Sequence, residues 1–321
     1  MNEYDVVVVG GGAAGLSAGL VLARARRRVA VVDAGEPRNA PAAHMQGFLG
    51  SDGLPPNELA AAGRAEVAGY GGDLVSGTVA SITLSAYTGA DGSRRFEIVL
   101  ADGSTLRTRR VLITTGLRDE VPDIPGVRER WGRDLLHCPY CHGYEVRDQP
   151  LGVLSGPPDL INETIAHAHL IRQWSDDVLF FANGAALTVD QRDQFDARAI
   201  GVIDEPVIRL VVENDQLAGV ELASGKVVAR TALFVRPRFV PNDDLLLSSG
   251  CATDDNGWVA VDGVGRTSTP GVWAAGNAVN PRAQVITAAG EGSTTAIAVN
   301  NDLVQEDLSL AVAGVHGVLP I

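Results

Sequence analysis

The sequence predicts an α/β fold, because apolar strands alternate with helical stretches across glycine-rich or proline-rich turns. Near the N-terminus, "DVVVVG" leads into the turn "GGGAAG", a helical stretch over 13–26 and the strand "RVAVVDAG". A second series begins with the strand "LGVL" at Leu151 and continues into a helical stretch over 160–174. The 321 residues fit two domains, at the usual length of about 100–200 residues each. We therefore expect two Rossmann-like dinucleotide-binding domains, each a three-layer ββα arrangement.

Composition and charge exclude several classes of partner. The net charge of −13 opposes nucleic-acid binding, which depends largely on Lys and Arg contacts to phosphates. No apolar run reaches the ~18 residues that a membrane-spanning helix needs, so we expect no membrane association. The beginning, "MNEYDVVVVG", is acidic and enters a strand directly, unlike a secretory signal. We therefore expect a cytoplasmic protein, whose three cysteines do not form a disulfide scaffold.

The turn "GGGAAG" places Gly10, Gly12 and Gly15 in the spacing of a dinucleotide-binding motif. Gly10 permits the tight turn, Gly12 lets a pyrophosphate approach the backbone, and Gly15 lets the helix pack on the strand. The pyrophosphate would lie at the helix N-terminus, whose unpaired N–H groups and dipole favour anions. Asp33 can accept hydrogen bonds from a ribose. The alternative is a glycine-rich turn that binds no ligand. The neighbours that we expect to line the site are Ala13, Ala14 and Ala34.

Two further segments indicate which dinucleotide binds. "TSTPGVWAAGNAVNPRAQVITAAGEG", over 267–292, contains a short buried strand that ends at Gly276 and a helical stretch from about Gln284. "RVLITTGLRDEVPDIPG" contains a strand, a turn over Thr114–Gly116 and a proline-rich crossover. Together with the N-terminal motif, these segments resemble the low-molecular-weight thioredoxin reductase branch of the flavoprotein disulfide reductases.

The resemblance covers essentially the whole chain and implies FAD as a non-covalently bound cofactor. It implies a discontinuous FAD-binding domain over 1–117 and 244–321, and an inserted NAD(P)H-binding-like domain over 118–243. A helix N-terminus near Gln284 would face the pyrimidine end of the flavin, which becomes anionic on reduction. The family usually has Gly-Asp where this chain has Gly-Asn. The FAD-contacting residues expected in these segments are Thr115, Gly116, Gly276, Asn277, Gln284, Val285 and Thr287.

The stretch "LLHCPYCHGYE" over 135–145 is compatible with four chemistries. CxxCH is the attachment signature of a c-type haem, but that attachment generally follows export. Structural zinc needs four ligands, usually in two separated pairs, and the sequence offers no second pair, so we expect no metal. CPYC also resembles the redox pair of a glutaredoxin, which would need its own small fold. A redox-active dithiol that exchanges electrons with a flavin agrees best with the rest of the chain. The remaining cysteine, Cys251, is expected to be a loop or packing residue.

By the family resemblance, Cys141 would face the flavin, and Cys138 would exchange with the substrate as a thiolate. His142 stands where thioredoxin reductases usually carry an acidic residue, and it can move protons at neutral pH. His137 and Glu145 are alternatives for that role. The string "CPYCHGYE" resembles the dithiol oxidases that close disulfides in small natural products such as holomycin and gliotoxin.

The second nucleotide motif is degenerate. The turn after "LGVL" is "SGPPD", in which Gly156 stands alone, while Pro157 and Pro158 lack the N–H groups that a pyrophosphate needs. The next strand is followed by "ANGAALT", which has no Arg for a 2′-phosphate, and Arg192 and Arg198 come only later. NADPH binding is therefore doubtful.

These features predict an FAD-dependent dithiol oxidase. Electrons would pass from a small dithiol through the cysteine pair to FAD and then to O2, which would become H2O2. One alternative is a thioredoxin reductase-like enzyme that receives electrons from NADPH or from another donor such as a ferredoxin. An alternative of another class is a non-enzymatic redox sensor that reports the state of the flavin or the thiols. By resemblance, the protein would be a homodimer.

Overall fold

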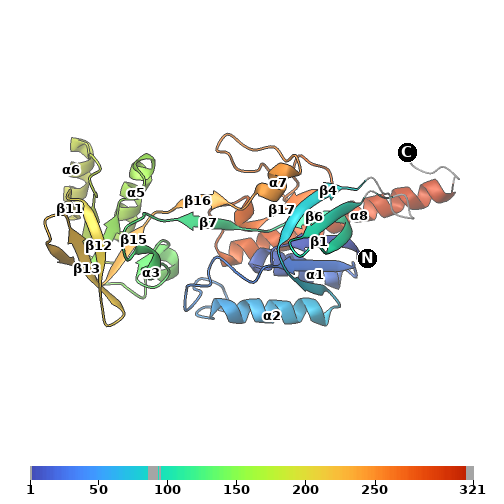
Figure 1. The fold of residues 1–321 in the computed structure, drawn as a ribbon, viewed down its shortest axis with the longest axis horizontal. Helices are drawn as coiled ribbons and strands as arrows, with labels where there is room; N and C mark the ends of the chain where they lie inside the picture. Colours follow the sequence, from blue (N-terminus) through green and yellow to red (C-terminus); the bar gives the residue numbers. More distant parts are fainter. Residues whose placement is uncertain (1, 86–92, 94, 316–321) are drawn as a thin grey trace. The chain divides into compact units, whose positions relative to one another are not determined.

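The computed structural model describes residues 2–85, 93 and 95–315, and the chain separates into two compact units (Figure 1). The first unit comprises Met1–Ala40, Pro55–Arg118 and Pro241–Ile321, and the second comprises Pro41–Leu54 and Asp119–Val240. Each unit contains a parallel sheet with helices packed on it. The predicted α/β fold, with a second Rossmann-like domain inserted in the first, is confirmed.

One segment differs from the expected domain boundaries. The sequence places residues 41–54 in the first domain, whereas Pro41–Leu54 belongs to the second unit. A Cβ atom added at Gly132 would lie 2.9 Å from Cβ of Pro41, so this segment packs against the chain that precedes the cysteine pair. The other boundaries fall within β7 (Leu117–Glu120) and β16 (Arg238–Pro241), which pair with one another.

The first unit is built on a seven-stranded sheet of order β3-β2-β1-β6-β5-β4, in which β17 also pairs with β6. Continuous apolar runs form its central strands, as expected for parallel strands that are covered on both faces. The parallel strands are β1 (Asn2–Val9), β2 (Val29–Asp33), β3 (Asp73–Ser76), β6 (Thr105–Ile113) and β17 (Val272–Ala274). The antiparallel strands are β4 (Val79–Leu84) and β5 (Phe96–Leu100).

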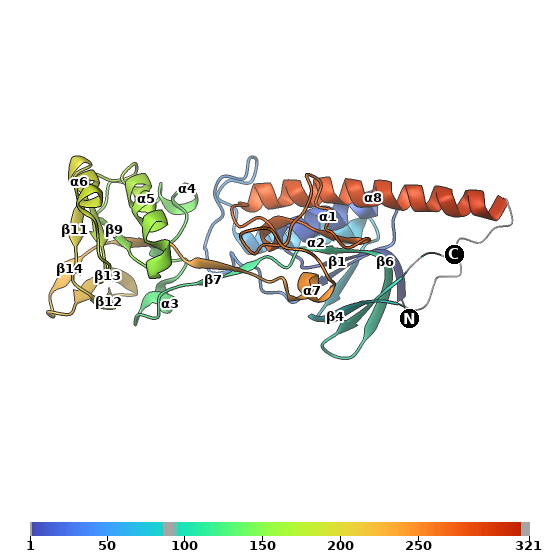
Figure 2. The same ribbon diagram turned by 90° about the horizontal axis from the view of Figure 1, so that it is seen from above.

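Separate cores fill the two faces of this sheet. On one face, α1 (Ala13–Arg24), α2 (Pro56–Gly69) and α8 (Val285–Val315) contribute a core with the apolar side chains of β1, and Figure 2 shows α8 running along α1. On the other face, β4 and β5 contribute a core with α7 (Asp244–Ser248). Cys251 is buried in this second core, which agrees with its predicted role in packing.

Helix α1 ends two residues before the predicted end, and its backbone shows why. Arg26 has a φ of 63°. Its N–H donates to the Ala23 carbonyl, and the N–H of Arg27 donates to the Leu22 carbonyl. This pair of hydrogen bonds closes the helix in a Schellman motif.

Helix α8 is held to the unit in two different ways. Its buried residues, including Gly292, Ala296 and Val299, all lie between 292 and 303. Beyond them, ion pairs replace apolar packing: the buried guanidinium of Arg109 contacts Glu306 at 2.6 Å, and Arg27, Arg110 and Asp307 join the same network.

The second unit has a smaller parallel sheet of order β11-β10-β9-β15-β8. Its strands are β8 (Leu135–Leu136), β9 (Leu151–Leu154), β10 (Val178–Phe181), β11 (Gly201–Ile203) and β15 (Ala232–Val235). A three-stranded antiparallel sheet supplies a second core on its other face, made of β12 (Val207–Glu213), β13 (Gln216–Leu222) and β14 (Val227–Ala229). The helices of this unit are α3 (Val127–Arg130), α4 (Pro139–His142), α5 (Ile161–Ile171) and α6 (Val189–Ala197).

The packing of α8 on α1 yields a test of the first unit. A Cβ atom at Gly292 would overlap the backbone of Ala14, so Gly292→Ala should lower the free energy of unfolding by about 1–3 kcal/mol, measured by urea denaturation. Gly290→Ala is the matched control, because a Cβ atom there meets nothing within 4 Å and alanine favours the helix by up to about 1 kcal/mol. Equal stabilities for the two variants would contradict this packing.

Candidate active site

The glycine turn between β1 and α1 has the geometry that a dinucleotide requires. Gly10 has a φ of 108°, and a Cβ atom there would lie 2.5 Å from the Thr114 carbonyl oxygen. A Cβ atom at Gly15 would overlap the Gly10 carbonyl, so only glycine lets α1 start this close to the strand. By contrast, a Cβ atom at Gly12 would meet nothing within 4 Å. The backbone at Gly12 is therefore open to an approaching phosphate, as the sequence predicts.

Asp33 ends β2 beside this turn. Its Oδ1 atom accepts a hydrogen bond from the Gly11 N–H at 3.1 Å, which leaves Oδ2 as the atom that can face a ribose. A Cβ atom at Gly11 would overlap the Asp33 carboxyl group. Gly11 is therefore required as well, which the GxGxxG pattern does not reveal because Gly11 occupies a variable position in it. Ala34 is exposed just beyond Asp33.

The C-terminal segment meets the glycine turn at Ala14. Gly276 has a φ of 69°, and a Cβ atom there would lie 2.9 Å from Cβ of Ala14. Gly292, in the second turn of α8, lies against the backbone of the same alanine. Ala13 and Ala14 begin α1, so the structure brings the two predicted parts of the FAD site together across about 260 residues of sequence.

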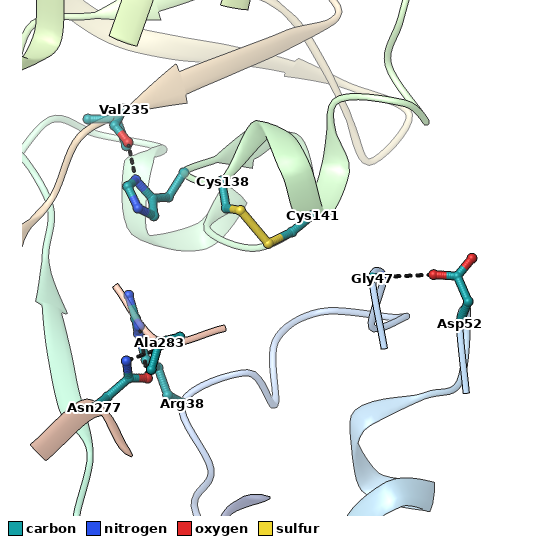
Figure 3. The surroundings of a disulfide bond; sticks show 9 residues. Arg38, Gly47, Asp52, Cys138, Cys141, Val235, Asn277 and Ala283 are labelled. Atoms are coloured by element: carbon teal, nitrogen blue, oxygen red, sulfur yellow. Dashed lines mark hydrogen bonds between the residues drawn. A yellow bond between two sulfur atoms is a disulfide. The ribbon is translucent and has the colours of Figure 1, made fainter. Parts of the chain in front are cut away.

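Asn277 braces the loop that leads to α8. Its side-chain amide donates to the Asn280 carbonyl at 2.9 Å. It also donates to the Ala283 carbonyl at 3.0 Å, and its Oδ1 atom lies 3.3 Å from the Arg38 guanidinium (Figure 3). An aspartate could not donate either bond. This geometry explains why the chain carries Asn where the family usually has Asp, and it gives the side chain a structural task that the sequence does not show.

Glu291 completes the same loop. Its Oε2 atom accepts from the Gly276 N–H at 3.0 Å, and its Oε1 atom accepts from the Asn280 side chain at 2.6 Å. Sequence analysis missed Glu291. An acid within a helix has many ordinary explanations, and only the fold shows that this one faces Gly276.

The start of α8 presents the backbone donors that the sequence predicts. The N–H of Ala288 donates to the Gln284 carbonyl, so the preceding amides, of Val285 to Thr287, lie in the first turn, where a helix has no intrahelical acceptor for them. Gln284 and Thr287 are exposed. Thr115 and Gly116 follow β6 and are tied to Asn242 by hydrogen bonds of 2.6–3.0 Å. Together, the open Gly12 backbone, the Asp33 carboxylate and these amides fit a dinucleotide such as FAD.

The cysteine pair forms a disulfide at the start of α4 in the second unit (Figure 3). Cys138 is the N-cap of this helix, and Pro139 occupies its first position, where the missing N–H costs no helical hydrogen bond. The N–H groups of Cys141 and His142 both donate to the Cys138 carbonyl at 3.1 Å. This turn holds the two Cα atoms 5.2 Å apart, within the range for a disulfide.

Three ionisable groups were predicted to serve this pair, and they lie in different surroundings. His142 is half-buried, and burial lowers the pKa of its imidazole, while the nearby Glu145 carboxylate acts in the opposite direction. Glu145 itself is exposed. Nδ1 of His137 lies 3.4 Å from the Val235 carbonyl, and its ring packs edge-on against Phe239. A neutral His142 can accept a proton at pH 7.

His167 is a buried neighbour of His137 that the sequence did not single out. Their ring centroids lie 5.8 Å apart. Burial, followed by the nearby His137 and Arg236, lowers the pKa of His167 to about 3. His167 is therefore neutral at physiological pH.

Arg192 and Arg198, which follow β10, make contacts within the second unit. Arg192 pairs with Asp204 at 2.7 Å, and Arg198 donates to the His169 carbonyl. Within residues 2–85, 93 and 95–315, no group of three or more His, Cys, Asp or Glu side chains is placed to hold a metal ion. In the same part of the chain, no helix is both long enough and apolar enough to cross a membrane.

Comparison with known proteins decides the family. Residues 4–157 and 176–292 match the pyridine nucleotide-disulphide oxidoreductase family. The chain belongs to that family. Thioredoxin reductase sirT of Leptosphaeria maculans is 29% identical over 95% of this chain and 96% of its own length. A probable thioredoxin reductase of Arthroderma benhamiae is 30% identical, over 59% of this chain and 46% of its own length. The crystal structure of HlmI is 57% identical, covers 97% of this chain and 95% of that chain, and superposes with a TM-score of 0.92.

These relatives confirm the resemblance inferred from the motifs. The protein is an enzyme of the pyridine nucleotide-disulphide oxidoreductase family and is thioredoxin reductase-like. Such oxidoreductases are FAD-binding flavoproteins, so the predicted cofactor is confirmed.

Asn277 provides a test of the loop at the cofactor site. In Asn277→Asp, a carboxylate would face the carbonyls of Asn280 and Ala283, and two donated hydrogen bonds would be lost. We expect a loss of about 1–3 kcal/mol in the free energy of unfolding and faster release of FAD, measured by thermal melting and by the flavin content after gel filtration. Asn301→Asp makes the same change at an exposed position of α8 and should leave both unchanged. Full FAD retention by Asn277→Asp would show that the brace is dispensable.

Proposed function

We propose that the protein is an FAD-dependent dithiol oxidase that closes a disulfide in a small-molecule dithiol. The observation that carries the proposal is a redox disulfide in a unit whose own nucleotide turn lacks the groups that bind a pyrophosphate. Pro157 and Pro158 contribute no N–H, and the arginines that follow the second strand are engaged within the unit. A flavoenzyme with a dithiol but no nicotinamide site takes its electrons from the dithiol side.

The proposed reaction balances as a two-electron transfer. The substrate dithiol gains an S–S bond and gives up two electrons and two protons, and the Cys138–Cys141 disulfide is reduced to two thiols. FAD, when bound, supplies the chemistry that takes the electron pair from these thiols and passes it to O2. The dioxygen takes up two electrons and two protons and becomes H2O2, and the cysteine disulfide is restored.

The cysteines and histidine have separate roles in the proposal. Cys138 exchanges with the substrate, as the family resemblance implies, and the exchange needs an attacking thiolate and a sulfur that it can reach. Cys141 resolves the mixed disulfide and delivers the electron pair to the flavin. His142 accepts the proton of the incoming thiol, since burial keeps its imidazole neutral at pH 7. His137 and Glu145 are the other residues of this stretch that could move a proton.

The proposal also includes a homodimer that works in the cytoplasm. Its support is the family resemblance, together with exposed apolar side chains on α8. Ile297, Val304, Leu308 and Val312 are each more than 40% exposed, and their spacings of seven and four residues repeat on one side of a helix.

A second candidate is a disulfide reductase of thioredoxin reductase type that draws electrons from NADPH or another donor. The names of the relatives favour it. The two candidates differ in the direction of electron flow, which one experiment separates.

Anaerobic reduction tests the proposed direction. Dithiothreitol should bleach the flavin absorbance of the holoenzyme far faster than NADPH does, and air should restore the absorbance with one H2O2 formed per disulfide. Cys138→Ser and Cys141→Ser should keep FAD but lose oxygen uptake with dithiol, and Cys251→Ser should keep both. Fast and saturable bleaching by NADPH at micromolar concentration would instead support the reductase.

The pKa of His142 gives a second test. As the base, His142 must be deprotonated, so dithiol-driven oxygen uptake should be retained at pH 7 and fall only below pH 6.5, the ordinary pKa of His. Glu145→Gln removes the charge that raises this pKa, so the acid limb should move to lower pH. His142→Ala should slow turnover by roughly 10²–10⁴-fold with FAD retained.

Glu163→Gln serves as the control for the pH profile, because it removes an exposed carboxylate from α5. It should leave the acid limb in place. An unchanged limb in Glu145→Gln, or a small effect of His142→Ala, would reassign the proton transfer to another group.

A further inference from the structure

The second unit keeps the strand order that creates a ligand-binding crevice. The strands of the unit's βαβ series follow one another along the chain as β9, β10, β11 and β15. In the sheet, β9 lies between β10 and β15. Ligands of open α/β sheets bind at the carboxyl ends of the strands where this order reverses, here between β9 and β15. A Cβ atom at Gly156, just after β9, would lie 3.3 Å from the Arg236 carbonyl, just after β15. The two chain segments that leave the sheet at this point are therefore adjacent.

Two backbone donors of the turn at this crevice are used within the turn itself. Pro157 and Pro158 have none. The N–H of Leu160 donates to the Pro157 carbonyl at 2.9 Å, and the N–H of Ile161 donates to the Pro158 carbonyl. A turn that binds phosphate would direct these groups at the ligand.

A carboxylate and a guanidinium meet across the same crevice. Asp159 comes from the turn after β9, and Arg238 begins β16, shortly after β15. One guanidinium nitrogen of Arg238 lies 2.7 Å from both carboxylate oxygens of Asp159. The arginine thus contacts an anion of its own chain at the place where a dinucleotide would offer a phosphate.

We propose that Asp159 is a built-in substitute for a phosphate, which engages Arg238 and excludes nicotinamide dinucleotides from the second unit. The exclusion has two parts. The carboxylate repels an incoming anion, and the guanidinium of Arg238, which the carboxylate contacts at 2.7 Å, is neutralised. Asp159 and Arg238 are thereby specificity-determining residues for the electron donor. This inference concerns anion binding only, and it goes beyond the direction of electron flow proposed above.

Calorimetry with inorganic pyrophosphate tests the proposal on the FAD-loaded protein. Wild-type protein should bind pyrophosphate very weakly. In Asp159→Asn the carboxylate charge is removed and Arg238 is released, so the affinity should rise at least about tenfold, as expected when a charge-assisted contact to phosphate becomes available. The double variant Asp159→Asn/Arg238→Gln should lose that gain, because the released cation is absent.

Asp176→Asn is the matched control. Asp176 pairs with Arg172 four residues earlier, and it precedes β10, at the opposite edge of the sheet from the crevice. Removing this carboxylate should give no gain in pyrophosphate affinity, and Arg172 keeps its bonds to the carbonyls of Ser175 and Arg198. The proposal is overturned when Asp159→Asn binds no more tightly than Asp176→Asn, or when the gain survives in the double variant. Retained flavin absorbance and circular dichroism show that each variant is folded, and oxygen uptake with dithiol remains a separate test of the proposed function.

Discussion

The cofactor site of the first unit depends on the close contact between α1 and α8 at Ala14. Gly292 brings the backbones of the two helices together, and Gly276 passes the same alanine at the end of β17. Neither contact leaves room for a side chain, so the two ends of the loop between β17 and α8 are fixed in position. Hydrogen bonds donated by Asn277 and accepted by Glu291 then hold the conformation of the loop itself. The start of α8 is thereby placed next to the glycine turn, although the two lie at opposite ends of the sequence.

The sequence predicts those features whose physical cause is local. The turn at Gly10, the helix that follows it and the strand that ends in Asp33 follow from a motif of a few adjacent residues, and the structure contains them all. The start of α8 was predicted at about Gln284 and lies at Val285, because a helix start also depends on adjacent residues. The task of Asn277 could not be predicted, because its two acceptors are backbone carbonyls whose direction only the folded loop determines. The pairing of Asp159 with Arg238 joins positions 79 residues apart, and nothing in either local stretch points to the other.

The second unit shows that a fold and its binding site are specified by different residues. Its sheet order depends on buried side chains such as Val153, Phe180 and Phe234, which are fully enclosed. Phosphate binding depends instead on a few N–H groups in one exposed turn, and proline removes them without touching the core. Such a unit can lose a ligand and keep its shape, because the apolar burial that stabilises it is unaffected.

The two ways in which α8 is attached give its ends different sensitivities to the solvent. The half that carries Gly292 and Val299 is held by close apolar packing, which added salt does not weaken. The half that carries Glu306 and Asp307 is held mainly by ion pairs to Arg27, Arg109 and Arg110. Salt screens the contacts of the exposed Asp307 carboxylate, whereas the buried Arg109 guanidinium is screened much less. High ionic strength should therefore loosen the last turns of this helix only partly, as a local opening beyond Asp307 with faster amide exchange there, while the cofactor end of the same helix stays protected.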